Sequence, residues 1–160
     1  MVRFGYHASH EQFPPSALLK YVTLAAQAGF TDAMSSDHFM PWSERQGQSG
    51  FAWSWLGAAL QATPLTFGMV CAPGKRYHPT IIAQASATLA EMFPGRVWCA
   101  FGSGQHLNEH ITGTGWLAKA DRNARLHECI QIIRALWAGE TVTAHSGYVT
   151  VIEAKLYTRP

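Results

Sequence analysis

The alternation of strand and helix patterns constrains the fold of this chain more than any other feature. Short apolar segments typical of strands are followed, each in turn, by helical patterns. The strand patterns occupy 2–7, 32–36, 65–71 and 96–101, and the helical ones 15–28, 51–62, 80–93 and 117–138. Strands that alternate with helices predict a parallel sheet with crossover helices. The alternating segment 141–152, centred on Ser146-Gly147, predicts a β-hairpin.

The apolar pattern within these segments predicts which faces are buried. The segment 65–71 is almost continuously apolar, as parallel strands covered on both faces are. Pro14-Pro15 predicts the start of the first helix and Gly29 its C-terminal cap. The apolar stripe expected on the first helix consists of Leu18, Leu19, Val22, Leu24 and Ala25. The stripe expected on the longest helix consists of Leu126, Ile130, Ile133 and Trp137.

Two architectures share this local pattern, an open doubly wound sheet and a (β/α)8 barrel. A whole barrel needs about 250 residues, and this chain has 160. The sheet is therefore open, or the chain is a fragment of a barrel, or two copies complete each other. A half-barrel leaves sheet edges and apolar faces uncovered, so we expect a homo-oligomer.

Composition excludes several classes of protein. Hydrophobic residues make up 48% and charged residues 14%, which excludes intrinsic disorder. The net charge of +2 gives no basic footprint for nucleic acid. No apolar run approaches the length of a membrane span, and the N-terminus has no apolar signal core. The three cysteines are widely spaced, which predicts reduced thiols in a cytoplasmic protein.

The loops that follow the strands carry most of the side chains suited to chemistry. The segments 37–42, 72–78 and 102–109 hold His, Trp, Asn, Gln and small residues, whereas the loops at the opposite rim are short turns. In both candidate architectures ligands bind at the carboxyl ends of the strands. This asymmetry predicts a small-molecule site at that edge of the sheet.

Each motif taken alone has a simpler interpretation. Asp37-His38 fits a helix-capping Asp beside a surface His about equally well. Gly102-Ser103-Gly104 suggests a dinucleotide loop, and hence an NAD enzyme with an open sheet, but the third Gly and the later acidic residue are missing. His106 and His110 have the spacing of a zinc pair, but the Glu is misplaced for the known motif, so we expect no metal.

Taken together, the strand ends resemble the luciferase-like flavin monooxygenase superfamily, close to its F420-dependent glucose-6-phosphate dehydrogenase branch. The resemblance covers essentially the whole chain in order. The stretches that carry it are SDHFMPW (36–42), SGFAWSWLGAAL (49–60), RYHPTIIAQASATL (76–89), FPGRV (93–97), GSGQHLNE (102–109) and ADRNARLHE (120–128). It implies an α/β fold of the (β/α)8 TIM-barrel family, with 1–160 forming a single-domain N-terminal half of about four β/α units plus a hairpin.

The resemblance also implies roles for individual residues. His38 matches an essential His near the reactive ring, and Trp42 a Trp that packs against ring and substrate. Met69-Val70 matches a non-proline cis peptide behind the flavin, a bond that costs about 3–4 kcal/mol. The implied catalytic positions are His38, Trp42 and Gln105, and the implied cofactor-binding positions are Asp37, Met69, Val70, Ala72, Ser103, Gly104 and Asn108.

Two positions depart from the dehydrogenase branch. Gln105 stands where that branch has a Glu that acts in proton transfer, and an amide cannot accept or deliver that proton. Ala72 stands in place of a cofactor-contacting Thr. The resemblance therefore does not carry over sugar-phosphate oxidation, and it favours a related clade that uses FMN, with coenzyme F420 a close second.

The resulting hypothesis is a flavin- or deazaflavin-dependent oxidoreductase that acts by hydride transfer on a small organic substrate. The alternative is a catalytically inactive half-barrel that associates with itself or with a partner. The first hypothesis requires His38, Trp42, Met69-Val70 and Asn108 to converge around one planar ring. The flavin would carry out the redox step, while the protein supplies position and electrostatics.

Overall fold

A computed structural model describes residues 2–160, which form two compact units. Unit 1 comprises Met1–Cys71 with Gly95–Ala100, and unit 2 comprises Ala72–Pro94 with Phe101–Pro160. The elements of unit 1 are β1 (Gly5–Ala8), α1 (Pro15–Gln27), β2 (Asp32–Ser35), α2 (Ala52–Ala62), β3 (Thr66–Cys71) and β4 (Val97–Phe101, as far as Ala100). This order confirms the predicted alternation of strands and helices.

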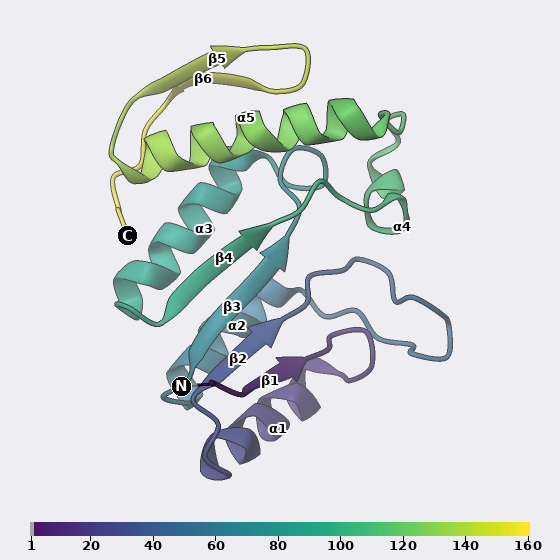
Figure 1. The fold of residues 1–160 in the computed structure, drawn as a ribbon, viewed down its shortest axis with the longest axis vertical. Helices are drawn as coiled ribbons and strands as arrows, with labels where there is room; N and C mark the ends of the chain where they lie inside the picture. The colour runs from purple at the N-terminus through teal and green to yellow at the C-terminus, as the bar shows by residue number, and fades with distance from the viewer. Residues whose placement is uncertain (1) are drawn as a thin grey trace. The chain divides into compact units, whose positions relative to one another are not determined.

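The strands form one four-stranded sheet in the order β1-β2-β3-β4 (Figure 1). Strand β1 runs parallel to β2, with Tyr6 opposite Ala33, and β2 runs parallel to β3, with Ala33 opposite Phe67. Parallel neighbours of this kind are joined by crossover connections, which are right-handed in nearly all proteins. The carboxyl ends of β1, β2 and β3 therefore lie at one edge of the sheet.

Helices α1 and α2 pack against each other and against the strands of unit 1. Pro15 stands in the first turn of α1, where its missing N–H is tolerated, and Gly29 follows the helix with a φ of 93° that favours glycine. Leu18, Val22 and Ala25 are buried as predicted, but Leu24 is exposed. Position 24 lies outside the arc that 18, 22 and 25 define at 3.6 residues per turn.

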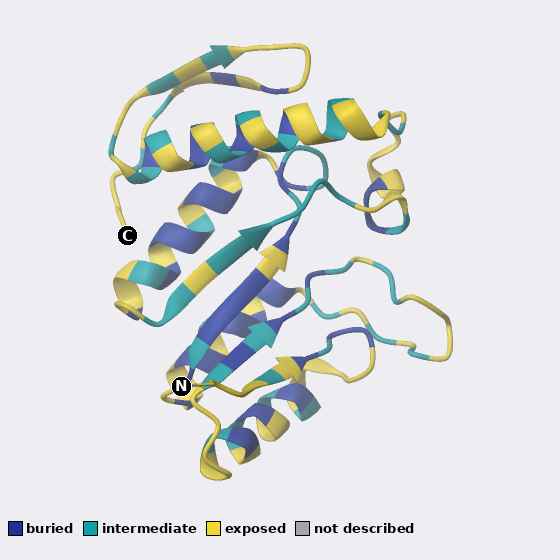
Figure 2. Ribbon diagram, in the orientation of Figure 1, coloured by how far each residue is buried: buried dark blue, intermediate teal, exposed yellow. Residues whose placement is uncertain are grey.

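Strand β3 forms the centre of the core of unit 1. Figure 2 shows it as the most continuously buried strand, which confirms the two-sided burial predicted for 65–71. At Gly68 the indole of Trp98 lies so close that an added Cβ would approach it to 2.0 Å. The guanidinium of Arg96 donates hydrogen bonds to the backbone oxygens of Leu60, Thr63 and Leu65, which joins the start of β4 to the α2–β3 connection.

Unit 2 contains two long helices and a hairpin. Its elements are α3 (Pro79–Met92), α4 (His106–Glu109), the 3-10 turn η1 (His110–Thr112), α5 (Lys119–Trp137), β5 (Val142–His145) and β6 (Thr150–Ala154). Helices α3 and α5 pack together, and the antiparallel β5–β6 pair lies along α5 (Figure 1). The hairpin prediction is confirmed. The segment 102–109, expected to be a loop, contains the helix α4, which is too short to show a helical period in the sequence.

Most residues buried along α5 lie one position N-terminal to those of the predicted apolar stripe. The structure buries Arg125, Cys129, Ile132, Ile133 and Leu136. Of the predicted stripe, only Ile133 is buried, while Leu126, Ile130 and Trp137 are half-buried. The cause is Arg125, which occupies the inner face and contacts the buried carboxylate of Glu109. Because a charged residue occupies an inner position, the apolar residues of the sequence indicate a helix face that is rotated from the buried one.

The cis peptide expected at Met69-Val70 is absent. All peptide bonds of the described residues are trans. Strand β3 continues through both residues to Cys71, and an ordinary strand uses trans bonds throughout.

The three cysteines form no disulfide with one another within residues 2–160; Cys71 and Cys129 are buried and Cys99 is half-buried. Among residues 2–160, no helix has both the length and the apolar character needed to cross a membrane.

Candidate functional site

A cavity of about 320 Å³ opens within unit 1 at the carboxyl ends of β1 and β2. Its volume lies at the lower end of the range of small-molecule pockets. The loop after β1 contributes Ser9 and Glu11, and the loop after β2 contributes the predicted residues Asp37, His38 and Trp42. The full lining is His7, Ser9, Glu11, Met34, Ser35, Ser36, Asp37, His38, Trp42, Gln46 and Val70.

Contacts hold both the backbone and the imidazole ring of His38. The Ser49 hydroxyl donates to the His38 carbonyl over 2.7 Å, and Nδ1 of the ring lies 2.8 Å from Oε1 of Glu11. The edge of the imidazole meets the Trp42 ring, with centroids 5.0 Å apart and planes at 77°. The amide of Trp42 is fixed in turn by the Gln46 side chain. His38 is therefore a positioned group and not a mobile surface histidine.

Glu11 is the functional residue that sequence reasoning missed. Its carboxylate is almost fully buried and also accepts from Ser9 Oγ over 2.7 Å and from Ser36 Oγ over 2.9 Å. Burial alone would raise the pKa of Glu11, but the contacts with His38, Ser9 and Ser36 outweigh it and hold the pKa at about 2. The residue follows β1 directly, so the strand-end rule that found His38 after the second strand would have found Glu11 after the first.

The walls of the cavity combine apolar and polar surface. Trp42 is 57% exposed and Val70 is 40% exposed, although both are large hydrophobic residues. Met69 is fully buried, and its side chain is not part of the wall, because successive residues of a strand point to opposite faces. Of the predicted pair Met69-Val70, Val70 lines the cavity and Met69 does not.

The remaining predicted residues belong to unit 2. There, the Asn108 amide donates to the Gln105 side-chain oxygen over 3.1 Å, and Ser103 accepts from the ammonium group of Lys119 over 2.7 Å. Gly104 has a φ of 87°, and its Cα packs against the Glu109 carboxylate. Ala72, at the end of β3, is half-buried. The structure thus gathers Asp37, His38, Trp42 and Val70 around one cavity, while the convergence of Asn108 with them stays a prediction.

The unit 1 cavity fits one face of a flavin-type ring. A flat heterocycle needs apolar surface to lie against, which Trp42 and Val70 offer, and polar groups at its edge, which Asp37 and His38 offer. A buried carboxylate behind an imidazole fixes the orientation and tautomer of the ring. The Glu11 carboxylate lies 2.8 Å from Nδ1 of His38, so a buried acidic group stands directly behind the imidazole. The arrangement therefore places a basic side chain with a fixed orientation on the cavity wall.

Comparison with known proteins identifies the family of this chain. The family model for luciferase-like monooxygenases matches residues 1–160. An F420-dependent glucose-6-phosphate dehydrogenase from Beutenbergia cavernae is 46% identical over 162 residues, which cover 100% of this chain and 48% of that protein. The chain thus spans about half the length of this relative.

Solved structures lead to the same family. A structure of an F420-dependent secondary alcohol dehydrogenase with an F420-acetone adduct matches with a TM-score of 0.94 and 39% identity, over 99% of this chain and 49% of that one. A riboflavin lyase with modified FMN matches with a TM-score of 0.78 and 14% identity, over 99% and 47%, which shows the fold alone. The fold is that of the N-terminal half of luciferase-like TIM barrels, and the chain belongs to the luciferase-like monooxygenase family.

Proposed function

We propose that this chain supplies half of an oxidoreductase that transfers hydride between a hydroxyl-bearing carbon of a small organic molecule and coenzyme F420. The observation that carries the proposal is the contact of His38 with the buried, ionised Glu11 on the wall of a cavity that Trp42 also lines. A base held next to a flat apolar surface suits removal of a hydroxyl proton as hydride leaves the adjacent carbon.

The chain's own residues then have distinct tasks. F420, when bound, supplies the hydride acceptor. His38 accepts the hydroxyl proton at Nε2, and Glu11 stabilises the imidazolium that results, through the contact at Nδ1. Trp42 and Val70 form the apolar surface that excludes water from the reacting face. Ser103, Gly104 and Asn108 contribute cofactor contacts from unit 2, as the family resemblance implies.

Two lines of support favour F420 over FMN. Both of the relatives described above that share more than a third of their residues with this chain are named for F420. The FMN-bound relative is only 14% identical and supports the fold alone. The substitution at Gln105 argues against glucose 6-phosphate itself, so a simple secondary alcohol is the better first substrate to test.

The active form is a complete barrel, in our proposal. Strands β1 and β4 are the outer strands of the sheet, and Phe4 and Trp98 are exposed in this region. Outer strands with exposed aromatic side chains associate unless another chain or segment covers them. Light scattering should report a dimer or larger species, and a stable monomer would contradict this part of the proposal. Cysteines that form no disulfide within residues 2–160 suit a reducing compartment such as the cytoplasm.

Cofactor titration tests the proposal directly. The purified chain is titrated with F420 and separately with FMN, and binding is followed by quenching of cofactor fluorescence. Trp42→Ala should weaken F420 binding about tenfold or more, since it removes a wall of the cavity. Phe30→Ala is the matched control, because Phe30 is an exposed aromatic residue of the same unit at the opposite end of β2.

Each outcome of the titration has a meaning. Binding of F420 that is weakened by Trp42→Ala and not by Phe30→Ala supports the proposal. Binding of FMN instead would keep the oxidoreductase and change its cofactor. Failure to bind either cofactor would favour the alternative, an inactive half-barrel.

A further inference from the structure

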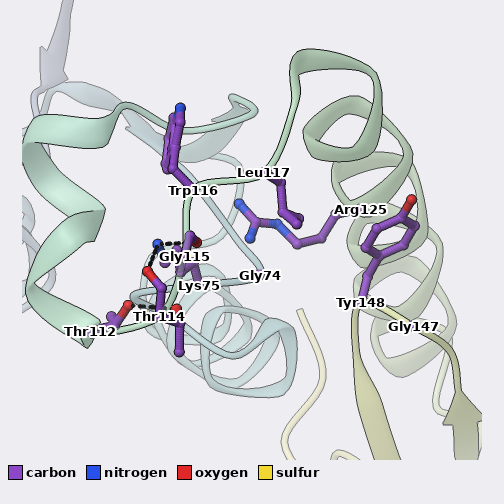
Figure 3. Close-up of a pocket in the computed structure, with 10 residues that line it drawn as sticks. All are labelled: Gly74, Lys75, Thr112, Thr114, Gly115, Trp116, Leu117, Arg125, Gly147 and Tyr148. Carbon is purple, nitrogen blue, oxygen red and sulfur yellow. Dashed lines mark hydrogen bonds between the residues drawn. The ribbon is translucent and has the colours of Figure 1, made fainter.

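Unit 2 contains a second and larger cavity, of about 550 Å³. Its walls come from the loop before α3, the loop before α5, helix α5 itself and the tip of the β5–β6 hairpin (Figure 3). This cavity is lined by none of the predicted cofactor-binding residues. The lining residues are Gly74, Lys75, Thr112, Thr114, Gly115, Trp116, Leu117, Arg125, Gly147 and Tyr148.

Arg125 is the buried cation of this cavity. It is only 5% exposed, and Figure 3 shows its side chain extending from α5 toward the loop that carries Gly115. One guanidinium nitrogen lies 3.3 Å from Glu109, while the buried Nε, beside Gly74, has no hydrogen-bond partner. A buried guanidinium normally uses most of its five N–H groups. Arg125 therefore has unused donor capacity in the wall.

The carboxylate that faces Arg125 does not fully neutralise it. Burial raises the pKa of Glu109, and the opposing effect of Arg125 does not cancel that increase. The single contact of 3.3 Å is long for a charge-assisted hydrogen bond. The positive charge of Arg125 is thus only partly compensated within the protein.

Two further cations gather around Trp116. The ammonium of Lys75 lies 5.3 Å from the centroid of the indole, and the guanidinium of Arg122 lies 4.5 Å from it. Lys75 donates to the carbonyl oxygens of Thr114 and Gly115, each over 3.0 Å, and these acceptors carry no full charge. Two cations on one aromatic ring repel each other and attract an anion.

The acidic side chains nearby have their own partners. Asp121 accepts a hydrogen bond of 2.8 Å from the Tyr148 hydroxyl, and Glu128 accepts one of 2.7 Å from Ser146. Both belong to α5, and neither lines the cavity. The lining itself holds two cations, Lys75 and Arg125, and no carboxylate. The charged side chains that line the cavity are therefore both cations, and Trp116 and Tyr148 are its flat aromatic walls.

We propose that this cavity binds a small organic anion, a phosphate or carboxylate group carried on a flat ring. Lys75 and Arg125 hold the charged group, since both charges lie on the same cavity, and Trp116 or Tyr148 packs against the ring. The volume is within the range of ligand pockets. Gly74 permits the arrangement, because a Cβ there would lie 2.9 Å from the Arg125 side chain.

Calorimetric titration with phenyl phosphate and with benzoate tests the proposal, using the whole chain without flavin at constant ionic strength. Lys75→Met should weaken phenyl phosphate binding about tenfold or more, as expected when one charge-assisted contact is lost. Lys155→Met is the matched control, because Lys155 is an exposed lysine of the same unit outside the cavity. Benzoate shows whether a carboxylate suffices or a phosphate is required.

Three results would overturn the proposal. The first is no measurable binding of either probe, and the second is an equal loss of binding in Lys75→Met and Lys155→Met, which would mean nonspecific charge attraction. The third is displacement of phenyl phosphate by F420 or FMN in the native chain, together with a loss of F420 or FMN binding in Lys75→Met. That result would assign the cavity to the cofactor's own phosphate. Unchanged thermal melting of Lys75→Met excludes loss of fold as the cause, and binding of phenyl phosphate to His38→Ala separates this site from the proposed function.

Discussion

Glu11 in unit 1 and Glu109 in unit 2 are both buried carboxylates beside a basic side chain, yet their pKa values move in opposite directions. Glu11 lies 2.8 Å from His38 and accepts from two serine hydroxyls, and its pKa falls to about 2. Glu109 lies 3.3 Å from Arg125 and accepts a backbone N–H over 3.2 Å, and its pKa rises because burial prevails. The number and length of the donor contacts decide the outcome, more than the presence of a cation.

The difference separates the two regions by what they can do. Unit 1 fixes a negative charge behind His38, which keeps the imidazole in one orientation. Unit 2 buries a carboxylate whose pKa is raised, and its single contact with Arg125 leaves the buried Nε of that guanidinium without a hydrogen-bond partner among residues 2–160. Four substitutions test this comparison, beginning with the one expected to have the largest effect.

Arg125→Met should lower the free energy of unfolding by about 3–5 kcal/mol at pH 7, because it leaves the Glu109 carboxylate buried without its cation. Urea denaturation measures the change. Arg134→Met is the matched control, since Arg134 is an exposed residue of the same helix. Adding Glu109→Gln should restore much of the lost stability. Equal effects of the Arg125 and Arg134 substitutions would mean that the buried pair is not important for stability.

His38→Ala should lower turnover about a hundredfold, equivalent to about 2.7 kcal/mol, because it removes the proposed general base. The free energy of unfolding should change by less than about 1 kcal/mol, since His38 lies on a cavity wall. Reduction of F420 by a secondary alcohol and thermal melting report the two quantities. Losses of similar size in activity and stability would assign His38 a structural role.

Glu11→Gln should change how the free energy of unfolding depends on pH in the acid range. A carboxyl whose pKa is about 2 in the folded chain and 4.5 otherwise stabilises the fold above pH 4.5, and this stabilisation is lost as the pH falls toward 2. The stabilisation amounts to about 2–3 kcal/mol. Urea denaturation across this range should show a slope for the native chain and little slope for the variant. Glu44→Gln, at an exposed position of the same unit, should keep the native slope.

His10→Leu should produce the smallest effect, also in acid. His10 is fully buried with neither ring nitrogen hydrogen-bonded, and burial lowers its pKa from 6.5 to about 4. The unfolded chain therefore takes up the proton first, so stability falls as the pH drops from 6.5 to 4, by about 2 kcal/mol. Thermal melting at pH 7 and pH 5 should differ less for the variant than for the native chain. The exposed His127→Leu should not alter this difference.

Individual residues show which parts of the two cavities could be predicted from the sequence. The strand-end rule located His38 and Trp42, because parallel strands bring their carboxyl ends to one edge whatever the loops contain. The same rule applies to Glu11, which follows the first strand. In the unit 2 cavity only Lys75 lies in one of the predicted strand-end loops, while Arg125 and Tyr148 come from distant segments with which it shares no motif.

The sequence by itself determined the order of elements, the family and the edge of the sheet at which the unit 1 cavity lies, because these follow from periodicity and from short motifs that act locally. Only the tertiary structure decided the environment of the charges. It lowers the pKa of Glu11 and raises that of Glu109, it places Arg125 on the buried face of α5, and it places Lys75 on a cavity wall. The physical reason is that the energy of a buried charge depends on burial and on contacts of about 3 Å. Those contacts join residues far apart in the chain, so no local pattern encodes them.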